Sequence, residues 1–236
     1  RLEVVFIRPS GSTLRVPGRR DNKQVIPWVF QGSEDYVGPK GKTSTLTIDP
    51  GVELQFSGGH LTIGRNVRLR INGTAQQPVL MTDATVCLDQ TELDDELVDP
   101  SWGIRVHSKA PKPVVASYCT FRDADTALWL SESRRTVLTH CRFEDCERQA
   151  IGVGEDAASA LTLTHCLFVN NRGGIRFAKP AKGSRVDACT FRGNSEFAIR
   201  NARAVSVDAS NCYWGHPSGP LDESDAHDTN YELKAT

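Results

Sequence analysis

A short motif, a cysteine followed two positions later by an aromatic residue, recurs at almost constant spacing through the second half of the chain. Successive cysteines are separated by 22, 25, 23 and 23 residues and are Cys119, Cys141, Cys166, Cys189 and Cys212. A second series, of aliphatic residues, is separated by 24, 23, 24 and 24 residues and comprises Ile104, Leu128, Ile151, Ile175 and Ile199. A period shared by two independent series indicates that one supersecondary unit repeats along the chain.

Each repeat contains short segments in which apolar and polar residues alternate. Gly103–Val106 and Gly174–Phe177 are examples, and Leu161 and Leu163 mark a further segment just before Cys166. Alternation with period two is typical of a strand with one buried face. A repeat of about 23 residues suits one coil of a solenoid, whose strands pair in parallel with neighbouring coils roughly 4.8 Å away. The sequence therefore predicts an all-β fold, a single right-handed parallel β-helix with about 23 residues and three short strands per coil.

The residue before each repeated cysteine is predicted to occupy a tight bend between the strand with the leucines and the strand with the Cys-x-Phe pair. Asn and His are enriched among non-glycine residues with a left-handed backbone, and His140, His165 and Asn211 fit this position. A metal or acid–base pair is the alternative role for the two histidines, although no third ligand occurs at a matching position. Further along the coil, Asn170, Asn171 and Asn194 fit the next bend and are expected to stack as a structural amide ladder.

The domain organisation follows from where the strand pattern begins and ends. Residues 43–220 are predicted to form the β-helix, with an acidic loop at 83–101 projecting from it. Residues 1–42 are expected to be an N-terminal cap or the tail of a preceding module, and residues 221–236 a C-terminal tail or cap. The acidic loop lacks the ligand spacing of an EF-hand, so we expect no cofactor. Calcium is the one metal that its carboxylates leave as an alternative.

Composition limits the partners of the chain. The net charge is −1, which offers no global attraction for nucleic acid, and no run of about 18 apolar residues indicates a transmembrane helix. Five of the seven cysteines occupy one repeated position rather than the paired spacings of a disulfide framework, so we expect them to fill the core as free thiols. The chain begins at Arg1 without a signal sequence, and we expect it to be part of a longer protein.

Several segments also resemble a known superfamily. The similarity covers roughly residues 44–220 and is carried by Leu46–Val52, Asn72–Thr74, Pro78–Thr82, Trp102–Ile104 and Asn211–Pro220. These segments are similar to the entry coils and closing Asn-x-x-Trp-Gly segment of bacterial surface proteins in the pectate-lyase-like right-handed β-helix superfamily. The resemblance implies a secreted or cell-surface location. It implies no single activity, because the superfamily contains lyases, hydrolases, epimerases, adhesins and scaffolds.

One outward-facing column is the predicted functional surface. If the aliphatic series points inward, the next residues point outward, and they are Arg105, Trp129, Gly152, Arg176 and Arg200. The resemblance implies that a substrate groove in this superfamily lies over the corresponding sheet. Guanidinium groups bind carboxylates or sulfates through forked hydrogen bonds, and an indole face receives a sugar ring or a cation. The candidate ligand-binding residues are Arg105, Trp129, Arg176, Lys179 and Arg200, and an ordinary solvent-facing surface remains the simpler interpretation.

A catalytic interpretation of the same surface rests on two carboxylates. Glu132 and Glu155 each follow the inward residue of their coil by four positions, and carboxylates about 5 Å apart on neighbouring coils would match a retaining glycosidase. Two solvated turn glutamates are the competing interpretation. A lyase would use Arg176 or Lys179 beside calcium, but the clustered aspartates of pectate lyases are missing from this column, as are the Asn-Thr-Asp and Asp-Asp signatures of polygalacturonases.

Three functions follow from these patterns. The favoured one is a non-catalytic secreted or cell-surface scaffold or adhesin-like module that binds polysaccharide through its basic and aromatic face. The alternatives are a polysaccharide-degrading hydrolase or lyase acting in a groove on the same sheet, and a purely structural spacer in a longer surface protein.

Overall fold

The computed structural model describes the chain in a series of segments that together contain all the repeats. They are residues 13–18, 20–21, 24–25, 28–31, 34–36, 43–57, 59–63, 66–83, 102–106, 113–130, 135–154, 160–178, 182–202 and 206–215.

In the described segments, the strands form three parallel sheets of seven strands each. The first sheet contains β1 (Thr13–Val16), β6 (Ser44–Ile48), β9 (Val67–Asn72), β12 (Val114–Ser117), β15 (Arg135–Thr139), β18 (Ala160–Thr164) and β21 (Arg185–Asp187). The second contains β4 (Trp28–Gln31), β7 (Glu53–Ser57), β10 (Val79–Asp83), β13 (Cys119–Arg122), β16 (Arg142–Glu144), β19 (Leu167–Val169) and β22 (Thr190–Arg192). The third contains β5 (Glu34–Tyr36), β8 (Gly59–Ile63), β11 (Trp102–Val106), β14 (Thr126–Leu130), β17 (Gln149–Val153), β20 (Gly173–Phe177) and β23 (Phe197–Asn201). A short antiparallel pair, β2 (Arg20–Asp21) and β3 (Gln24–Val25), lies outside them.

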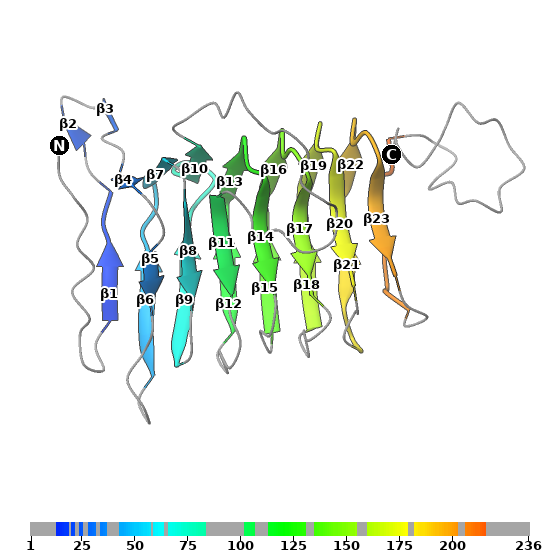
Figure 1. The fold of residues 1–236 in the computed structure, drawn as a ribbon, viewed down its shortest axis with the longest axis horizontal. Helices are drawn as coiled ribbons and strands as arrows, with labels where there is room; N and C mark the ends of the chain where they lie inside the picture. The colour runs from blue at the N-terminus through cyan, green and yellow to red at the C-terminus, as the bar shows by residue number, and fades with distance from the viewer. Residues whose placement is uncertain are drawn as a thin grey trace, which may run out of the picture.

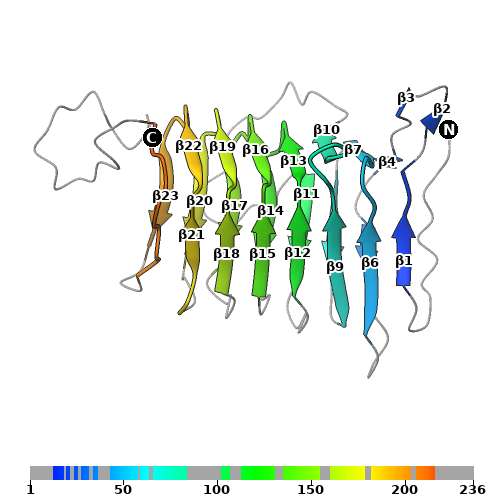
Figure 2. The same ribbon diagram turned by 180° about the vertical axis from the view of Figure 1, so that it is seen from behind.

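Each coil contributes one strand to the first, second and third sheet in turn, so the coils stack along the long axis of the molecule (Figures 1 and 2). The register confirms the predicted aliphatic series, because each member is paired with the next from Ile104 to Ile199. The predicted all-β solenoid of parallel strands is therefore confirmed, with the predicted three strands in a coil.

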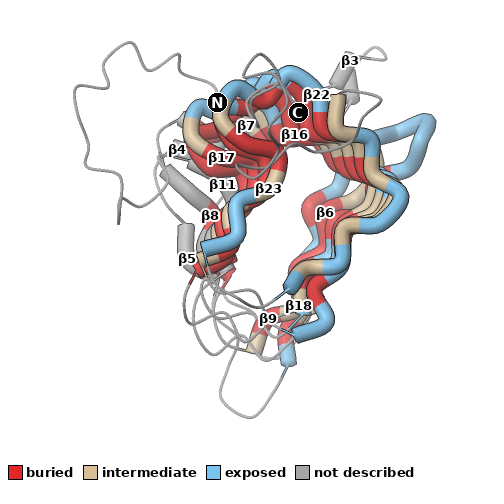
Figure 3. The backbone as a smooth tube through the Cα atoms, turned by 90° about the vertical axis from the view of Figure 1, so that its right-hand side faces the viewer, coloured by how far each residue is buried: buried red, intermediate tan, exposed pale blue. Residues whose placement is uncertain are grey.

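Stacked aromatic rings run through the core beneath the second sheet. Ring centroids of successive members lie 4.9, 5.0, 4.7 and 5.1 Å apart along the series Phe121, Phe143, Phe168, Phe191 and Trp214. These distances match the spacing of neighbouring strands, so one ring per coil forms a continuous stack. Figure 3, a view along the stack, shows buried residues lining the inside of each coil.

Left-handed residues turn the chain between sheets, as the sequence predicted. The bend before the second sheet has positive φ at Tyr118, His140, His165, Ala188 and Asn211. The rings of Tyr118, His140 and His165 stack with centroids 4.6 and 5.0 Å apart. A second left-handed column lies before the third sheet, at the bend predicted for Asn170, and contains Asp123, Asp145, Asn170 and Gly193.

An amide ladder satisfies the buried backbone next to this second bend. Asn171 is fully buried, accepts a hydrogen bond from the backbone N–H of Cys146 and donates to the carbonyl oxygen of Phe143. Its Nδ2 also donates to Oδ1 of Asn194 at 2.9 Å, and Asn194 Nδ2 donates to the carbonyl oxygen of Phe168. The predicted structural role is confirmed. The prediction was wrong for Asn170, which forms the left-handed bend itself.

The described cysteines are free thiols, as predicted. Five are buried and Cys212 is half-buried at the C-terminal end of the series. Burial raises the pKa of the Cys119 and Cys146 thiols, and contact with the Cys166 thiol together with burial raises the pKa of Cys189 to about 12. The thiol form therefore dominates at neutral pH, as expected of core residues.

The N-terminal segment supplies strands to the same sheets. β1, β4 and β5 pair in parallel with β6, β7 and β8, so this part of residues 1–42 continues the stack before residue 43. Its role as a cap or as the tail of another module stays a prediction. Residues 84–101 of the expected acidic loop and the segment 221–236 lie outside the described residues. Within the described part of the chain, no helix is long and apolar enough to cross a membrane.

Candidate functional site

The predicted outward residues do form one column on the third sheet. Backbone pairing connects Arg105 with Trp129, Trp129 with Gly152, Gly152 with Arg176, and Arg176 with Arg200. We call these five residues the third-sheet column. They lie on β11, β14, β17, β20 and β23, one residue in each of five successive coils. The spacing of parallel strands places neighbouring members roughly 4.8 Å apart along the solenoid axis.

The register extends the third-sheet column in the N-terminal direction. Arg105 is paired with Thr62 on β8, and Thr62 is paired with Asp35 on β5. Sequence reasoning missed both positions because the marker series begins only at Ile104. The longer column brings a carboxylate residue into the register, at the end opposite to Arg200.

Trp129 lies over the neighbouring glycine. A Cβ atom added to Gly152 would stand 2.4 Å from Cε3 and 2.5 Å from Cζ3 of the Trp129 indole. The six-membered part of the indole therefore fills the space that a side chain at position 152 would need. Trp129 is half-buried, so part of the residue reaches solvent. The absence of a side chain at Gly152 thus lets the indole pack against the sheet.

Gln149 completes this arrangement and was not predicted. Its Nε2 would lie 2.8 Å from a Cβ atom added to Gly152, and the residue is buried although it is polar. It begins β17 and is paired with Thr126 on the preceding coil. A signal for it exists in the sequence: four positions separate Gln149 from the bend residue Asp145, whereas three separate Thr126 from Asp123. The longer bend brings an amide beside the indole.

Two arginines follow on the next coils. Arg176 is half-buried and Arg200 is exposed. The Arg200 guanidinium carbon lies 4.5 Å from the ring centroid of Phe197, within the range of a cation–π interaction. Phe197 in turn lies over Gly173, where an added Cβ atom would stand 2.3 Å from its Cζ. The pattern of an aromatic ring over a glycine therefore occurs twice on this sheet.

The remaining predicted site residues lie outside the part of the chain that the structure describes. They are Lys179, Glu132 and Glu155. The two-carboxylate hypothesis therefore stays a prediction, since the separation of these side chains is the quantity on which it depends. Among the described residues, no group of three or more His, Cys, Asp or Glu side chains is arranged to hold a metal ion.

The geometry of the third-sheet column suits recognition of a polymer. An indole face contributes apolar contact area, the Gln149 amide lies buried beside it, and two guanidinium groups contribute positive charge on successive coils. These groups lie on adjacent strands, which hold them at a fixed repeat. A ligand with a regular repeat along its length can use several of them at once.

Comparison with known proteins gives one match. A family model described as "Right handed beta helix region" matches residues 63–191 and 102–215. No curated protein and no solved structure matches the chain.

Proposed function

The chain belongs to the right-handed β-helix family, and from this premise we propose that it is a non-catalytic secreted or cell-surface scaffold that binds an acidic polysaccharide through the third-sheet column. The observation that carries the proposal is the contact of the Trp129 indole with Gly152 on the next coil. Gly152 lies one coil before Arg176 and two coils before Arg200. The secreted or cell-surface location is part of the proposal, because it is where such a polymer occurs.

The aromatic part of the surface supports a sugar ligand. An indole held against the sheet loses little conformational entropy on binding, because its position is already set by the glycine beneath it. The C–H face of a sugar ring packs against such an indole. A half-buried aromatic residue on an outer sheet face fits this role.

The basic part of the surface supports an acidic sugar. Arg176 and Arg200 occupy successive coils, and each guanidinium can form a bidentate pair with a carboxylate. Arg200 is positioned by the Phe197 ring beneath it. A chain of uronic acid residues lying along the solenoid axis would present carboxylates to both coils and a sugar face to the indole.

The test is binding of uronic acid oligosaccharides, measured by isothermal titration calorimetry. We expect Trp129→Ala and Arg176→Ala each to weaken binding at least about tenfold, which corresponds to the loss of about 1.4 kcal/mol. Tyr213→Ala, an exposed aromatic residue outside the third sheet, and Arg70→Ala, an exposed arginine on the first sheet, are matched controls and should leave affinity unchanged.

Two results would reject the proposal. The first is binding that the controls weaken as much as the third-sheet variants do. The second is release of new reducing ends or of unsaturated products when the intact chain is incubated with the polymer, since that result would establish the hydrolase or lyase alternative.

A further inference from the structure

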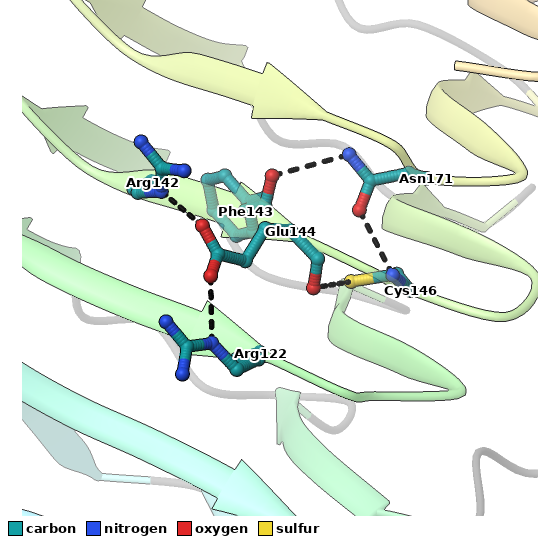
Figure 4. A network of polar contacts seen from close by, with 6 residues as sticks. All are labelled: Arg122, Arg142, Phe143, Glu144, Cys146 and Asn171. Carbon is teal, nitrogen blue, oxygen red and sulfur yellow. Dashed lines mark hydrogen bonds and ion pairs between the residues drawn. The ribbon is translucent and has the colours of Figure 1, made fainter. Parts of the chain in front are cut away.

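Two arginines on the outer face of the second sheet share a single carboxylate. Arg122 Nε donates to Glu144 Oε1 at 2.6 Å, and Arg142 Nε donates to Glu144 Oε2. Arg122 ends β13, while Arg142 and Glu144 flank Phe143 on β16 of the next coil. Figure 4 shows the carboxylate between the two guanidinium groups. We call these three side chains the Arg–Glu–Arg cluster.

Charge in the cluster is not balanced. Two guanidinium groups face one carboxylate, which leaves one positive charge. The side chain of Glu144 is 8% exposed, whereas those of Arg122 and Arg142 are 46% and 42% exposed. The carboxylate is therefore buried, while the two guanidinium side chains reach solvent. An anion approaching from solvent meets guanidinium groups first.

Each guanidinium group keeps unused donors. Glu144 takes the Nε–H of both, and the Nη groups of neither arginine form a hydrogen bond with another side chain in the part of the chain that the structure describes. In Figure 4 the dashed lines to the carboxylate end on the Nε atoms, and none joins an Nη atom of either group to another residue drawn. Arginine donors not satisfied by protein are available to an oxyanion.

The cluster is held in position before any ligand binds. Phe143, between Arg142 and Glu144 in the sequence, is fully buried in the aromatic stack, which anchors β16. Glu144 is paired with Arg122 in the backbone register, and Arg142 with Thr120. A shared carboxylate then restricts both guanidinium groups, so part of the entropy cost of ordering them is removed from ligand binding.

We propose that the Arg–Glu–Arg cluster is an anion site that binds a tetrahedral oxyanion, the sulfate or phosphate ester group of a polymer. A carboxylate has only two oxygens, and both lie in one plane. A sulfate or phosphate ester has three free oxygens in different directions and can accept from the Nη groups of two guanidinium groups on neighbouring coils.

This site is independent of the proposed polysaccharide surface. The Arg–Glu–Arg cluster lies on the second sheet, and the third-sheet column lies on the third. Arg192, which occupies the same outward column two coils beyond Glu144, offers a control on the same face. It is exposed and is paired with Val169, and it has no carboxylate beside it in the register.

The primary experiment titrates the whole chain with inorganic sulfate and inorganic phosphate at constant ionic strength, followed by backbone amide chemical shifts. We expect saturable chemical-shift changes at Arg122, Arg142 and Glu144. Acetate, added to the same total concentration of negative charge, should cause much smaller changes. Arg122→Ala and Arg142→Ala should each weaken binding at least about fivefold, while Arg192→Ala should leave it unchanged. Arg122→Lys keeps the charge but loses the forked donors, so it should also weaken binding.

Glu144→Gln separates a built site from simple attraction of charges. The substitution raises the local charge from one positive to two, so unspecific electrostatics predicts tighter binding of sulfate. If the carboxylate positions the two guanidinium groups, the same variant binds sulfate more weakly despite its higher charge. Thermal unfolding of each variant establishes that it is folded before it is titrated.

The outcomes are distinguishable. Weaker binding in Arg122→Ala, Arg122→Lys and Glu144→Gln supports the site, and binding that Arg192→Ala weakens equally, or that Glu144→Gln tightens, overturns it. Sulfated and phosphorylated polysaccharides then identify the source of the group, with a polymer bearing only carboxylates as reference. If Trp129→Ala abolishes binding of these polysaccharides and Arg122→Ala leaves their binding unchanged, the polymer is assigned to the third-sheet column and this site is rejected.

Discussion

The Trp129 indole occupies the position in which a side chain of Gly152 would stand, with Cε3 2.4 Å and Cζ3 2.5 Å from an added Cβ atom. The two residues are paired on neighbouring strands, so the contact joins two coils of the solenoid. This relationship couples the candidate ligand surface to the packing of the sheet. A change at the glycine is therefore expected to alter both stability and binding.

Gly152→Ala is expected to displace the indole. The clash is with a side chain, which can rotate, so the expected loss in free energy of unfolding is about 1–3 kcal/mol. Gly174→Ala on the same sheet should cost more, because its Cβ atom would lie 2.2 Å from the backbone carbonyl oxygen of Ala198. Urea unfolding measures both, and a larger loss for Gly152→Ala would contradict the arrangement.

Phe143→Ala tests the aromatic stack. The side chain is fully buried between Phe121 and Phe168, so its removal leaves a cavity in the middle of the stack. We expect the free energy of unfolding to fall by about 3–5 kcal/mol. Val115→Ala, at an exposed position of the first sheet, should change it by less than about 0.5 kcal/mol. Similar losses for the two variants would show that the stack contributes little.

Asn171→Asp tests the amide ladder. The amide Nδ2 donates to two acceptors, the Phe143 carbonyl oxygen and Asn194 Oδ1, and an ionised carboxylate would face both without a proton. We expect a loss of about 3 kcal/mol or more at pH 7, and a smaller loss at pH 4, where the carboxyl group regains a donor. Asn72→Asp, at an exposed position, should show no such pH dependence.

Glu144 should contribute stability that depends on pH. Burial by itself would raise the pKa of this carboxyl group, but hydrogen bonds from Arg142 and Arg122 and their positive charges hold its pKa below the ordinary value of 4.5. The folded state then binds fewer protons than the unfolded state. The contribution is fully present above about pH 4.5 and is lost as pH falls through the lower, folded pKa. The difference in free energy of unfolding between the native chain and Glu144→Gln should accordingly shrink between pH 5 and pH 2.

A constant difference between these two proteins across the same range would contradict the interaction. Guanidinium chloride would screen the ion pairs, so the measurement uses urea.

The described thiols should react slowly in the folded protein. Burial raises the pKa of Cys146, and contact with the Cys189 thiol together with burial raises the pKa of Cys212. Cys87 lies outside the described residues, so the experiment uses a Cys87→Ser variant. In this variant we expect a thiol reagent at pH 8 to label the folded chain at least about 100-fold more slowly than the unfolded chain. Half-buried Cys212 should be labelled first, as mass spectrometry of the digested chain would show. Labelling of Cys119 or Cys166 ahead of Cys212 would contradict the burial.

Much of the architecture could be predicted because the side of a strand on which each side chain lies follows from its position in the local alternation. The period of the Cys-x-Phe pairs and of the aliphatic series assigns each residue to the inside or the outside of a coil, and the register of Ile104, Leu128 and Ile151 follows it. The bend before each repeated cysteine was predicted from the period. Residue type supported a left-handed backbone there at His140 and His165, but not at Tyr118 and Ala188, since neither residue favours that conformation.

The site could be predicted only in part. The members of the third-sheet column follow from the period, whereas Gln149 joins them because one bend is a residue longer than its neighbour. The Arg–Glu–Arg cluster was not predicted, because its sequence signal is only an arginine and a glutamate in one short strand and a second arginine one coil earlier.

The sequence by itself determined the repeat, the parallel solenoid and the face on which each strand residue lies, because these depend on alternation and spacing along the chain. Only the tertiary structure decided that Trp129 lies on Gly152 and that Glu144 holds both Arg122 and Arg142. Such contacts depend on bend lengths and side-chain rotamers in neighbouring coils, which are set by packing between residues more than twenty positions apart.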